Sequence, residues 1–489
     1  MNPSLMNKEK LIKQLQKIIG TEAVLHAHED LKPFECDGLS AYREVPLAVV
    51  LPDNEAQVRE ILLLCRKENV AVVARGAGTG LSGGALPLAG GVLLSLSKFK
   101  RILSLDPLAR IARVQPGVRN QAISEAATAH GLYYAPDPSS QIACSIGGNV
   151  AENAGGVHCL KYGLTVHNVL KVRAYTMDGD LLEMGAEALD SAGYDLLALF
   201  TGSEGMLGVI TEVTVKLLPK PELAQVVMAA FASVAEAGNA VGDIIAAGII
   251  PAGLEMMDKL SIEAVEDFIH AGYPLDAEAI LLCESDGTPE EVAEEISKMQ
   301  TILTRCGATS LRTSANEVER LRLWAGRKAA FPAVGRLSPD YYCMDGTIPR
   351  RHLAHVLQRI NELSSEYKLR VANVFHAGDG NLHPLILYDA NQAGEFHRAE
   401  ELGGKILELC VEVGGTITGE HGVGIEKINQ MCSQFKEAEL QIFREVKQAF
   451  DPSGLLNPGK VIPTLHRCAE QGRVHVHHGK VAFPEIPRF

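Results

Sequence analysis

A glycine-rich loop near the start of the chain limits the possible folds more than any other feature. Residues 78–83, Gly-Thr-Gly-Leu-Ser-Gly, match the pattern G-x-G-x-x-G and follow an apolar strand. In a Rossmann unit such a loop opens a helix, and the N-terminus of that helix holds the pyrophosphate. Here Pro87, Gly90 and Gly91 leave no room for a helix before the next strand, VLLSL. The sequence therefore argues against a Rossmann fold.

The same loop can still bind a phosphate group. Glycines allow successive backbone N–H groups to point at one anion, with no side chain in the way. Two more glycine-rich segments follow, CSIGGNVAENAGG at 144–156 and TGSEGMLGVI at 201–210. One such loop is usually a set of tight turns in a β-rich domain. Three of them favour a large cofactor that is held mainly by the backbone.

Composition excludes several classes of protein. The net charge of −14 argues against a nucleic-acid binder, which usually needs a basic face. The apolar runs are shorter than the ~20 residues that a spanning helix needs, and the N-terminus does not have the pattern of a signal peptide. We therefore expect a soluble protein. None of the ten cysteines forms a C-x-x-C pair, which argues against an iron–sulfur cluster or a structural zinc in this chain.

Several long motifs are similar to those of the vanillyl-alcohol-oxidase family of FAD-linked oxidases. They are PLAVVLPDNEAQV, RGAGTGLSGG, PDPSSQIACSIGGNVAENAGG, KYGLTVHNV, LFTGSEGMLGVIT and the closing LLNPGK. Within that family the chain resembles the flavoprotein subunits of bacterial glycolate oxidases. The resemblance implies an α+β fold with a two-subdomain FAD-binding domain of the PCMH type and an α+β substrate (cap) domain with an antiparallel sheet. We expect an N-terminal helical segment (1–45), the FAD-binding domain (46–220), the cap domain (221–425) and a C-terminal segment that returns to the FAD domain (426–489).

The resemblance implies that FAD binds in an extended form along the glycine loops. Its pyrophosphate would lie on Arg75, Gly76, Ala77, Gly78, Thr79, Gly80, Leu81, Ser82 and Gly83. Its isoalloxazine and ribityl chain would lie beside Pro138, Ser139, Gly147, Gly148, Asn149, Ala154 and Gly155. Its adenosine side would meet Glu204, Gly208 and Ile210, and Asn457 of the closing motif is also assigned to the cofactor. Some relatives attach the flavin through a histidine in the first loop, and because this loop has none we expect non-covalent FAD.

A histidine–carboxylate set lies in the second half of the chain. The stretch VANVFHAGDGNLHPLILYD predicts a hairpin with His376 and His383 on either side of its turn. Glu420 and His421 are neighbours in the glycine-rich segment GGTITGEHGVG. Two histidines and a carboxylate are a usual ligand set for Zn²⁺, Mn²⁺ or Fe²⁺ with positions left open for substrate. We assign His376, His383 and Glu420 to a metal and His421 to a catalytic base, and the resemblance implies the same roles.

The resemblance implies a 2-hydroxy acid as the substrate, and the carboxylate of such an acid needs a cation to bind it. On the sequence alone, Arg327 is as readily a surface arginine on an amphipathic helix, with Lys328 and Arg336 as nearby substitutes. The resemblance implies that Arg327, in a W-x-x-R pattern, binds the substrate carboxylate. The resemblance also shows a difference from the 2-hydroxyglutarate dehydrogenases. Those enzymes have a lysine for the second carboxylate at the position of Cys343 and an asparagine at the position of Leu385. That difference favours a small monocarboxylate.

These features favour an FAD-dependent enzyme that oxidises a small 2-hydroxy acid, glycolate and also D-lactate, to the 2-oxo acid. The resemblance implies a second flavin-type subunit and an iron–sulfur partner subunit that receives the electrons. It also implies a cytoplasmic location, with contact to the inner membrane only through those partners. The alternatives are a stand-alone D-lactate dehydrogenase, a non-catalytic flavin-binding subunit and a nicotinamide-dependent dehydrogenase.

Overall fold

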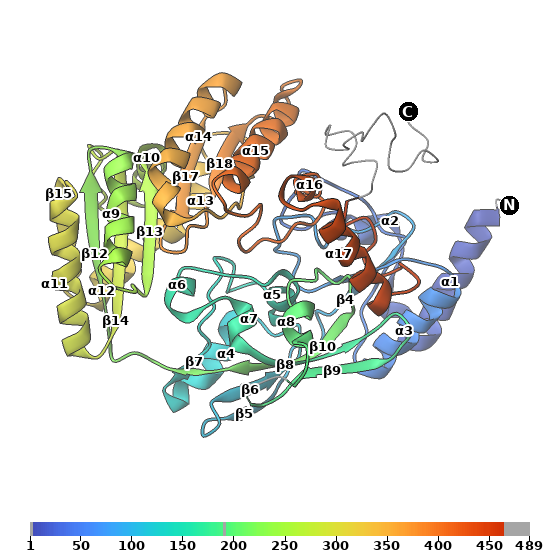
Figure 1. Cartoon of the computed structure of the whole chain (residues 1–489). Coiled ribbons are helices and arrows are strands. Elements are labelled where there is room, and N and C mark those ends of the chain that lie inside the picture. The colour runs from blue at the N-terminus through green and yellow to red at the C-terminus, as the bar shows by residue number, and fades with distance from the viewer. Residues whose placement is uncertain (1–2, 189–191, 464–489) are drawn as a thin grey trace.

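The computed structural model describes residues 3–188 and 192–463. Two parts lie side by side in Figure 1, the FAD-binding domain built on two sheets and the cap domain built on a third. The α+β fold class predicted from the sequence is therefore confirmed. Within the described residues, no helix is both long enough and apolar enough to cross a bilayer.

The first sheet of the FAD-binding domain has the strand order β1-β2-β4-β3. Its strands are β1 (Val24–Leu25), β2 (Ala48–Val50), β3 (Val72–Arg75) and β4 (Val92–Ser95). Strands β2, β3 and β4 run parallel, and α3 (Glu55–Lys67) crosses from β2 to β3. The Asn54 side chain accepts the Gln57 N–H and so caps α3. Strand β1 and the helix α1 (Pro3–Ile19) lie in the segment that was expected to be helical, and both belong to this subdomain. Strand β1 was not predicted, because two strand residues are too few to produce a periodic signal.

The second sheet of this domain is antiparallel, with the order β5-β6-β10-β8-β9. Its strands are β5 (Ile102–Asp106), β6 (Ile111–Val114), β8 (Val169–Tyr175), β9 (Leu181–Gly185) and β10 (Val209–Lys216). The helices α4 (Asn120–Ala127), α5 (Ile146–Glu152) and α8 (Leu196–Phe200) contribute to the same hydrophobic core. Smaller elements complete the domain: α2 (His28–Leu31), α6 (Cys159–Tyr162), α7 (Thr165–Asn168) and the strand pair β7 (Leu132–Tyr133) with β11 (Leu218–Pro219).

The cap domain has a seven-stranded antiparallel sheet with the order β15-β12-β14-β13-β17-β18-β16. Its strands are β12 (Leu223–Phe231), β13 (Gly253–Asp258), β14 (Ala279–Gly287), β15 (Ser310–Thr313), β16 (Asp340–Cys343), β17 (Val371–His376) and β18 (Pro384–Tyr388). Alternate residues of one strand enter two different cores, so Val227 and Ala229 face one side while Val226 and Met228 face the other. Helices therefore cover both faces of the sheet.

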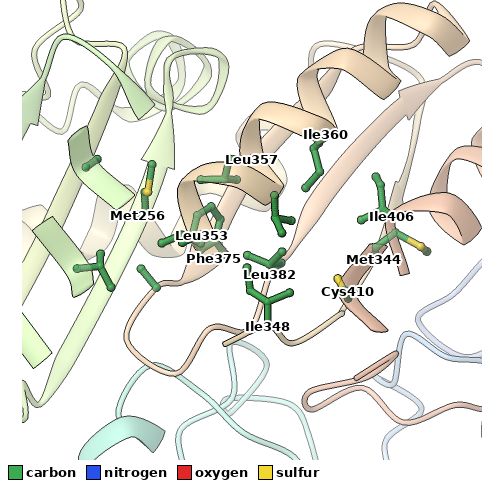
Figure 2. Packing of buried hydrophobic residues seen from close by; sticks show 14 of the residues in the cluster. Met256, Met344, Ile348, Leu353, Leu357, Ile360, Phe375, Leu382, Ile406 and Cys410 are labelled. Carbon is green, nitrogen blue, oxygen red and sulfur yellow. The ribbon is translucent and has the colours of Figure 1, made fainter. Parts of the chain in front are cut away.

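The larger core of the cap lies under α9 (Val234–Ala246), α11 (Pro289–Arg305), α14 (Leu353–Tyr367) and α15 (Glu395–Glu412). Figure 2 shows how the α14 side chains Leu353, Leu357 and Ile360 pack toward Phe375 of β17. The opposite face is covered by α10 (Lys259–Ile269), α12 (Glu317–Lys328) and α13 (Ala330–Val334). Helix α12 carries Arg327 and β17 ends at His376, so these rigid elements fix the candidate site residues.

The end of the described chain returns to the FAD-binding domain, as the resemblance implied. After α16 (Met431–Gln434), the helix α17 (Glu437–Phe450) lies over that domain (Figure 1), where Phe450 contacts Phe200. Leu456 then forms a parallel bridge with Val72, and the Asn457 N–H donates to the Val72 carbonyl at 2.8 Å. Positions 464–489 of the predicted C-terminal segment lie outside the described residues.

Candidate active site

A cavity of about 410 Å³ opens between the glycine loops of the FAD-binding domain and the histidine–carboxylate set of the cap. Most of the residues assigned to FAD line it: Arg75, Gly76, Ala77, Gly78, Thr79, Gly80, Leu81, Pro138, Ser139, Gly147, Gly148, Asn149, Ala154, Glu204, Gly208 and Ile210. From the cap, Arg327, His383, Glu420 and His421 reach the same cavity. The structure thus brings the residues assigned to FAD together with the candidate catalytic residues of the cap, although Arg75 and His421 are more than 300 positions apart in the sequence.

Four residues assigned to FAD do not line this cavity. They are Ser82, Gly83, Gly155 and Asn457. The Asn457 amide donates to the carbonyls of Gly84 (2.8 Å) and Glu204 (2.6 Å), so it holds two of the loops from behind. Gly155 lies against Glu420, where a Cβ atom would be 2.6 Å from Oε2 of the carboxylate. Only glycine lets this loop approach the Glu420 carboxylate so closely.

The first glycine loop begins directly at the end of β3 and has no helix after it, as the sequence predicted. Gly78 has φ +70°, a left-handed conformation that side chains disfavour. A Cβ atom at Gly80 would meet nothing within 4 Å, so the backbone faces open space there. Arg75 supports the loop by donating to the Ala85 carbonyl at 2.6 Å. The result is an open backbone cradle that fits the pyrophosphate of an extended dinucleotide.

The predicted hairpin is present, with β17 ending at His376 and β18 starting directly after His383. The Nε2 atoms of His376 and His383 lie 3.3 and 3.2 Å from Oε1 of Glu420. Nδ1 of His383 is buried without a hydrogen-bond partner among the described residues, and Nε2, although 3.2 Å from Glu420, makes no well-aligned hydrogen bond there. Buried polar atoms of this kind call for a ligand. Together the three side chains offer donor atoms within 4.8 Å of one another, which fits a divalent cation.

His421 lies beside this cluster and faces the cavity. Its ring stacks on the His383 ring, with centroids 4.9 Å apart and planes 5° apart. Nδ1 of His421 is buried and has no hydrogen-bond partner within the described chain. Burial lowers the pKa of His421 to about 4, and Asp345 only partly opposes the shift. The imidazole is therefore neutral near pH 7, as a base that accepts a proton must be.

Glu255 is a site residue that the sequence prediction missed. It lies on β13, where its Oε1 accepts from Nδ1 of His376 and its Oε2 accepts from Nε of Arg327, both at 2.7 Å. Burial would raise the pKa of Glu255, but His376 and Arg327 outweigh it and hold the pKa below its usual value. A lone glutamate within the apolar strand GLEMMD was the signal available in the sequence. One carboxylate thus orients both a predicted metal ligand and the predicted substrate-binding arginine.

The other predicted cations differ in position. Arg327 is buried and lines the cavity, as does Lys328, whereas Arg336 lies away from it and pairs with Asp267. Cys343 and Leu385 are directly opposite each other on β16 and β18. Neither of these two residues lines the cavity.

Two buried carboxylates lie where the FAD loops meet the loop of Glu420 and His421. Glu204 accepts the backbone N–H groups of Val423 (2.6 Å) and Gly424 (2.7 Å). Burial raises the pKa of Glu204 to about 7, although these donors oppose the shift. Burial and the neighbouring Glu204 raise the pKa of Glu152 well above its usual value. Both oxygens of Glu204 accept N–H groups, whereas Oε2 of Glu152 has no hydrogen-bond partner among the described residues.

Two protein families match the chain. Residues 46–185 match the family described as "FAD binding domain", and residues 220–461 match "FAD linked oxidases, C-terminal domain". The p-cresol methylhydroxylase structure with substrate bound has a similar fold, with a TM-score of 0.80 at 16% identity, and the match covers 94% of this chain and 97% of that one. The PCMH-type fold expected from the resemblance is confirmed by this likeness.

Sequence relatives agree with the family matches. The chain is 68% identical to the glycolate oxidase subunit GlcD of Escherichia coli K12, over 99% of this chain and 97% of the relative. It is 39% identical to the Bacillus subtilis GlcD (92% and 96% covered) and 32% identical to a D-lactate dehydrogenase of Anaerostipes hadrus (94% and 98% covered). The chain therefore belongs to the FAD-linked oxidases, in the group that includes the glycolate oxidase subunit GlcD.

Proposed function

We propose that this protein oxidises glycolate, and also D-lactate, to the corresponding 2-oxo acid with non-covalent FAD and a divalent cation. The observation that supports this most directly is the shared cavity, in which the glycine loops face His383, Glu420, His421 and Arg327. A flavin cradle alone would also suit a non-catalytic subunit. A complete set of base, carboxylate-binding cation and metal ligands against that cradle favours catalysis.

Each side chain has a role in this proposal that its surroundings support. The guanidinium of Arg327 binds the substrate carboxylate, while Glu255 fixes its orientation. Neutral His421 accepts the proton of the substrate hydroxyl. When bound, FAD would supply the hydride acceptor, and a cation held by His376, His383 and Glu420 would supply a Lewis acid that acidifies the hydroxyl.

The nature of the proposed substrate follows from the same residues. Cys343 and Leu385 differ from the lysine and asparagine of 2-hydroxyglutarate dehydrogenases, and this sequence difference, rather than a contact in the cavity, favours a monocarboxylate. Lys328 is a second cation from the cap in the cavity wall, so a dicarboxylate is a comparison to include in any assay.

We also propose that the electrons leave through an iron–sulfur partner subunit beside a second flavin-type subunit. The relatives named GlcD are subunits, which supports a larger assembly. This chain has no C-x-x-C pair and so lacks the usual spacing for a cluster of its own. A cytoplasmic complex that touches the inner membrane through its partners fits these features.

Steady-state kinetics with a dye acceptor test the proposed function. We expect kcat/KM to be highest for glycolate, lower for D-lactate and at least about 100-fold lower for L-lactate and D-2-hydroxyglutarate. A clear preference for D-lactate would support the stand-alone D-lactate dehydrogenase instead. Turnover of none of the four acids by the FAD-loaded protein would contradict the proposal.

The non-covalent state of FAD can be tested separately. Because no histidine lies in the loop from Arg75 to Gly84, acid precipitation should release the flavin into the supernatant. Yellow flavin retained in the washed pellet would contradict this prediction.

A further inference from the structure

The segment of residues 418–424, which carries Glu420 and His421, has no regular secondary structure, yet five of its seven backbone N–H groups are hydrogen-bonded. We call residues 418–424 the base loop. It lies between α15 and α16 and meets both domains. A loop of this kind needs partners for its buried N–H groups, because each one left unpaired would cost free energy. Two carboxylates supply most of these partners.

Asp345 holds the first half of the base loop from the cap side. It is fully buried and follows β16. Its Oδ2 accepts the His421 N–H (2.9 Å), and its Oδ1 accepts the Glu420 N–H (3.1 Å). The Gly419 N–H is shared between the Asp345 backbone carbonyl (2.8 Å) and Oδ2 (3.1 Å). The Thr418 hydroxyl donates to Oδ2 at 2.6 Å. Three consecutive amides therefore converge on one carboxylate, which forces this part of the backbone to curve.

Glu204 holds the second half from the side of the FAD-binding domain. Each of its oxygens accepts one backbone N–H, from Val423 and Gly424. Lys427 joins the two halves, because its ammonium donates to the Gly422 carbonyl at 2.8 Å and lies 3.3 Å from Asp345 Oδ2. The base loop is thus held by one carboxylate from each domain.

We propose that Asp345 and Glu204 are positioning residues that give the base loop the curvature at which Glu420 and His421 both face the cavity. Neighbouring residues in extended backbone point to opposite sides. Here Glu420 reaches His376 and His383 while His421 stacks on His383, so the two adjacent side chains share one target. The effect on rate rests on the proposed function, whereas the effect on the backbone does not.

Other roles for the two carboxylates fit the contacts less well. Asp345, His383 and His421 also form a set that could hold a metal, and Asp345 Oδ1 lies 3.6 Å from Nε2 of His383. However, the amide, hydroxyl and ammonium donors already occupy most of its lone pairs. Glu204 was expected to meet the adenosine of FAD, but both of its oxygens are committed to the base loop.

Amide hydrogen exchange of the unsubstituted holoenzyme gives the first test and needs no variant. Fragmentation of the exchanged peptides gives the deuterium uptake of single amides. The amides of residues 419–421 and 423–424 should be strongly protected from exchange, although they belong to no helix or strand. The exposed turn in which Asp106 accepts the N–H groups of Leu108 and Ala109 provides the comparison. Exchange in the base loop as fast as in that turn would overturn the proposal.

The variants Asp345→Asn and Glu204→Gln test which carboxylate holds which half of the base loop, and Asp106→Asn is the matched control. We expect Asp345→Asn to raise exchange mainly at 419–421 and Glu204→Gln mainly at 423–424. Each should lower kcat about 10- to 100-fold, since charge-assisted bonds to the loop are lost, while KM and FAD content change little.

Glu204→Gln that loses FAD but leaves exchange and kcat of the FAD-loaded enzyme unchanged would overturn the role of Glu204. If no 2-hydroxy acid is turned over even without substitution, the proposed function fails, but the exchange pattern still decides the proposal.

Discussion

Glu255 shows how one buried carboxylate can organise a site from behind. Its oxygens separately orient His376 and Arg327, which are 49 positions apart in the sequence (376 − 327) and come from different elements. A carboxylate on the outer nitrogen of a metal-binding histidine fixes the tautomer and raises the basicity of the ring. In the proposed function, the same residue would therefore support both cation binding by His376 and substrate binding by Arg327.

Replacing Glu255 by glutamine should impair both functions together. The amide cannot accept from both neighbours at once, so we expect kcat/KM for glycolate to fall about 10- to 100-fold and the affinity for the divalent cation to fall by a similar factor. Kinetics with metal titration measure the two effects. The exposed pair Glu278–Lys259 offers a control in Glu278→Gln, which should change neither. Loss of one function with the other intact would contradict a shared role for Glu255.

His421 provides a prediction with a defined sign in pH. The pKa of His421 is lowered to about 4, mainly by burial, and the base must be neutral to act. Activity that depends on His421 should therefore be constant near neutral pH and decline only as the pH falls toward about 4. A pH profile of kcat/KM checks this, and an acidic limb near the ordinary histidine pKa of about 6.5 would contradict it.

The variant His421→Ala complements the pH profile. It should retain FAD and its melting temperature while turnover falls at least about 100-fold, the usual contribution of general base catalysis. A nearly normal rate in this variant would show that another group takes the proton.

At the scale of elements, sequence reasoning worked where the local signal was strong. The hairpin of β17 and β18 places His376 and His383 on either side of its turn, as predicted. Alternating apolar residues and capping side chains are encoded locally, so these elements could be recognised without tertiary information.

The missed features depend on contacts between segments that are distant in the sequence. Glu255, Asp345 and Glu204 act through partners 72 to 220 positions away. No local pattern shows that the amides of a loop converge on a carboxylate from another domain. Glu204 was assigned to the cofactor from the family resemblance and lines the cavity, whereas its bonds to Val423 and Gly424 have no local signal in the sequence.

His158, directly before α6, links the two domains through charges and supports a prediction on stability. Its Nδ1 lies 2.8 Å from Asp137 of the FAD-binding domain, and its Nε2 lies 3.2 Å from Glu284 of the cap, which also pairs with Arg320. Burial would lower the pKa of His158, but Asp137 and Glu284 outweigh it and raise the pKa well above the usual value. The stabilising effect is therefore complete below the unfolded pKa of about 6.5 and is lost as the pH rises through the folded pKa.

His158→Gln should consequently destabilise the protein more at low than at high pH. At about pH 6 we expect a loss of about 3 kcal/mol, because the carboxylates lose a charged partner, and a smaller loss at about pH 9. Denaturant unfolding of both proteins at the two pH values measures the difference. The His158 side chain is 26% exposed, so solvent screening makes this value an upper bound. A loss that is equal at both pH values, or larger at the higher one, would contradict the role of the imidazolium.

On the scale of the whole molecule, the site exists only where the two domains meet. The FAD-binding domain contributes the backbone cradle, and the cap contributes Arg327, His376, His383, Glu420 and His421. Neither part contains the complete set of groups that the oxidation needs. The C-terminal segment returns to the first sheet, and Asn457 holds two of the cofactor loops in place.

Anaerobic mixing of the FAD-loaded protein with glycolate tests this account most directly. With a divalent cation bound, glycolate should bleach the oxidised flavin. After chelation the flavin should remain bound but bleach at least about 100-fold more slowly, because Lewis-acid assistance is worth several kcal/mol, and added Mn²⁺ or Zn²⁺ should restore the rate. Bleaching that is equally fast in the chelated protein, or absent under every condition, would contradict the proposal that flavin, cation and base share one cavity.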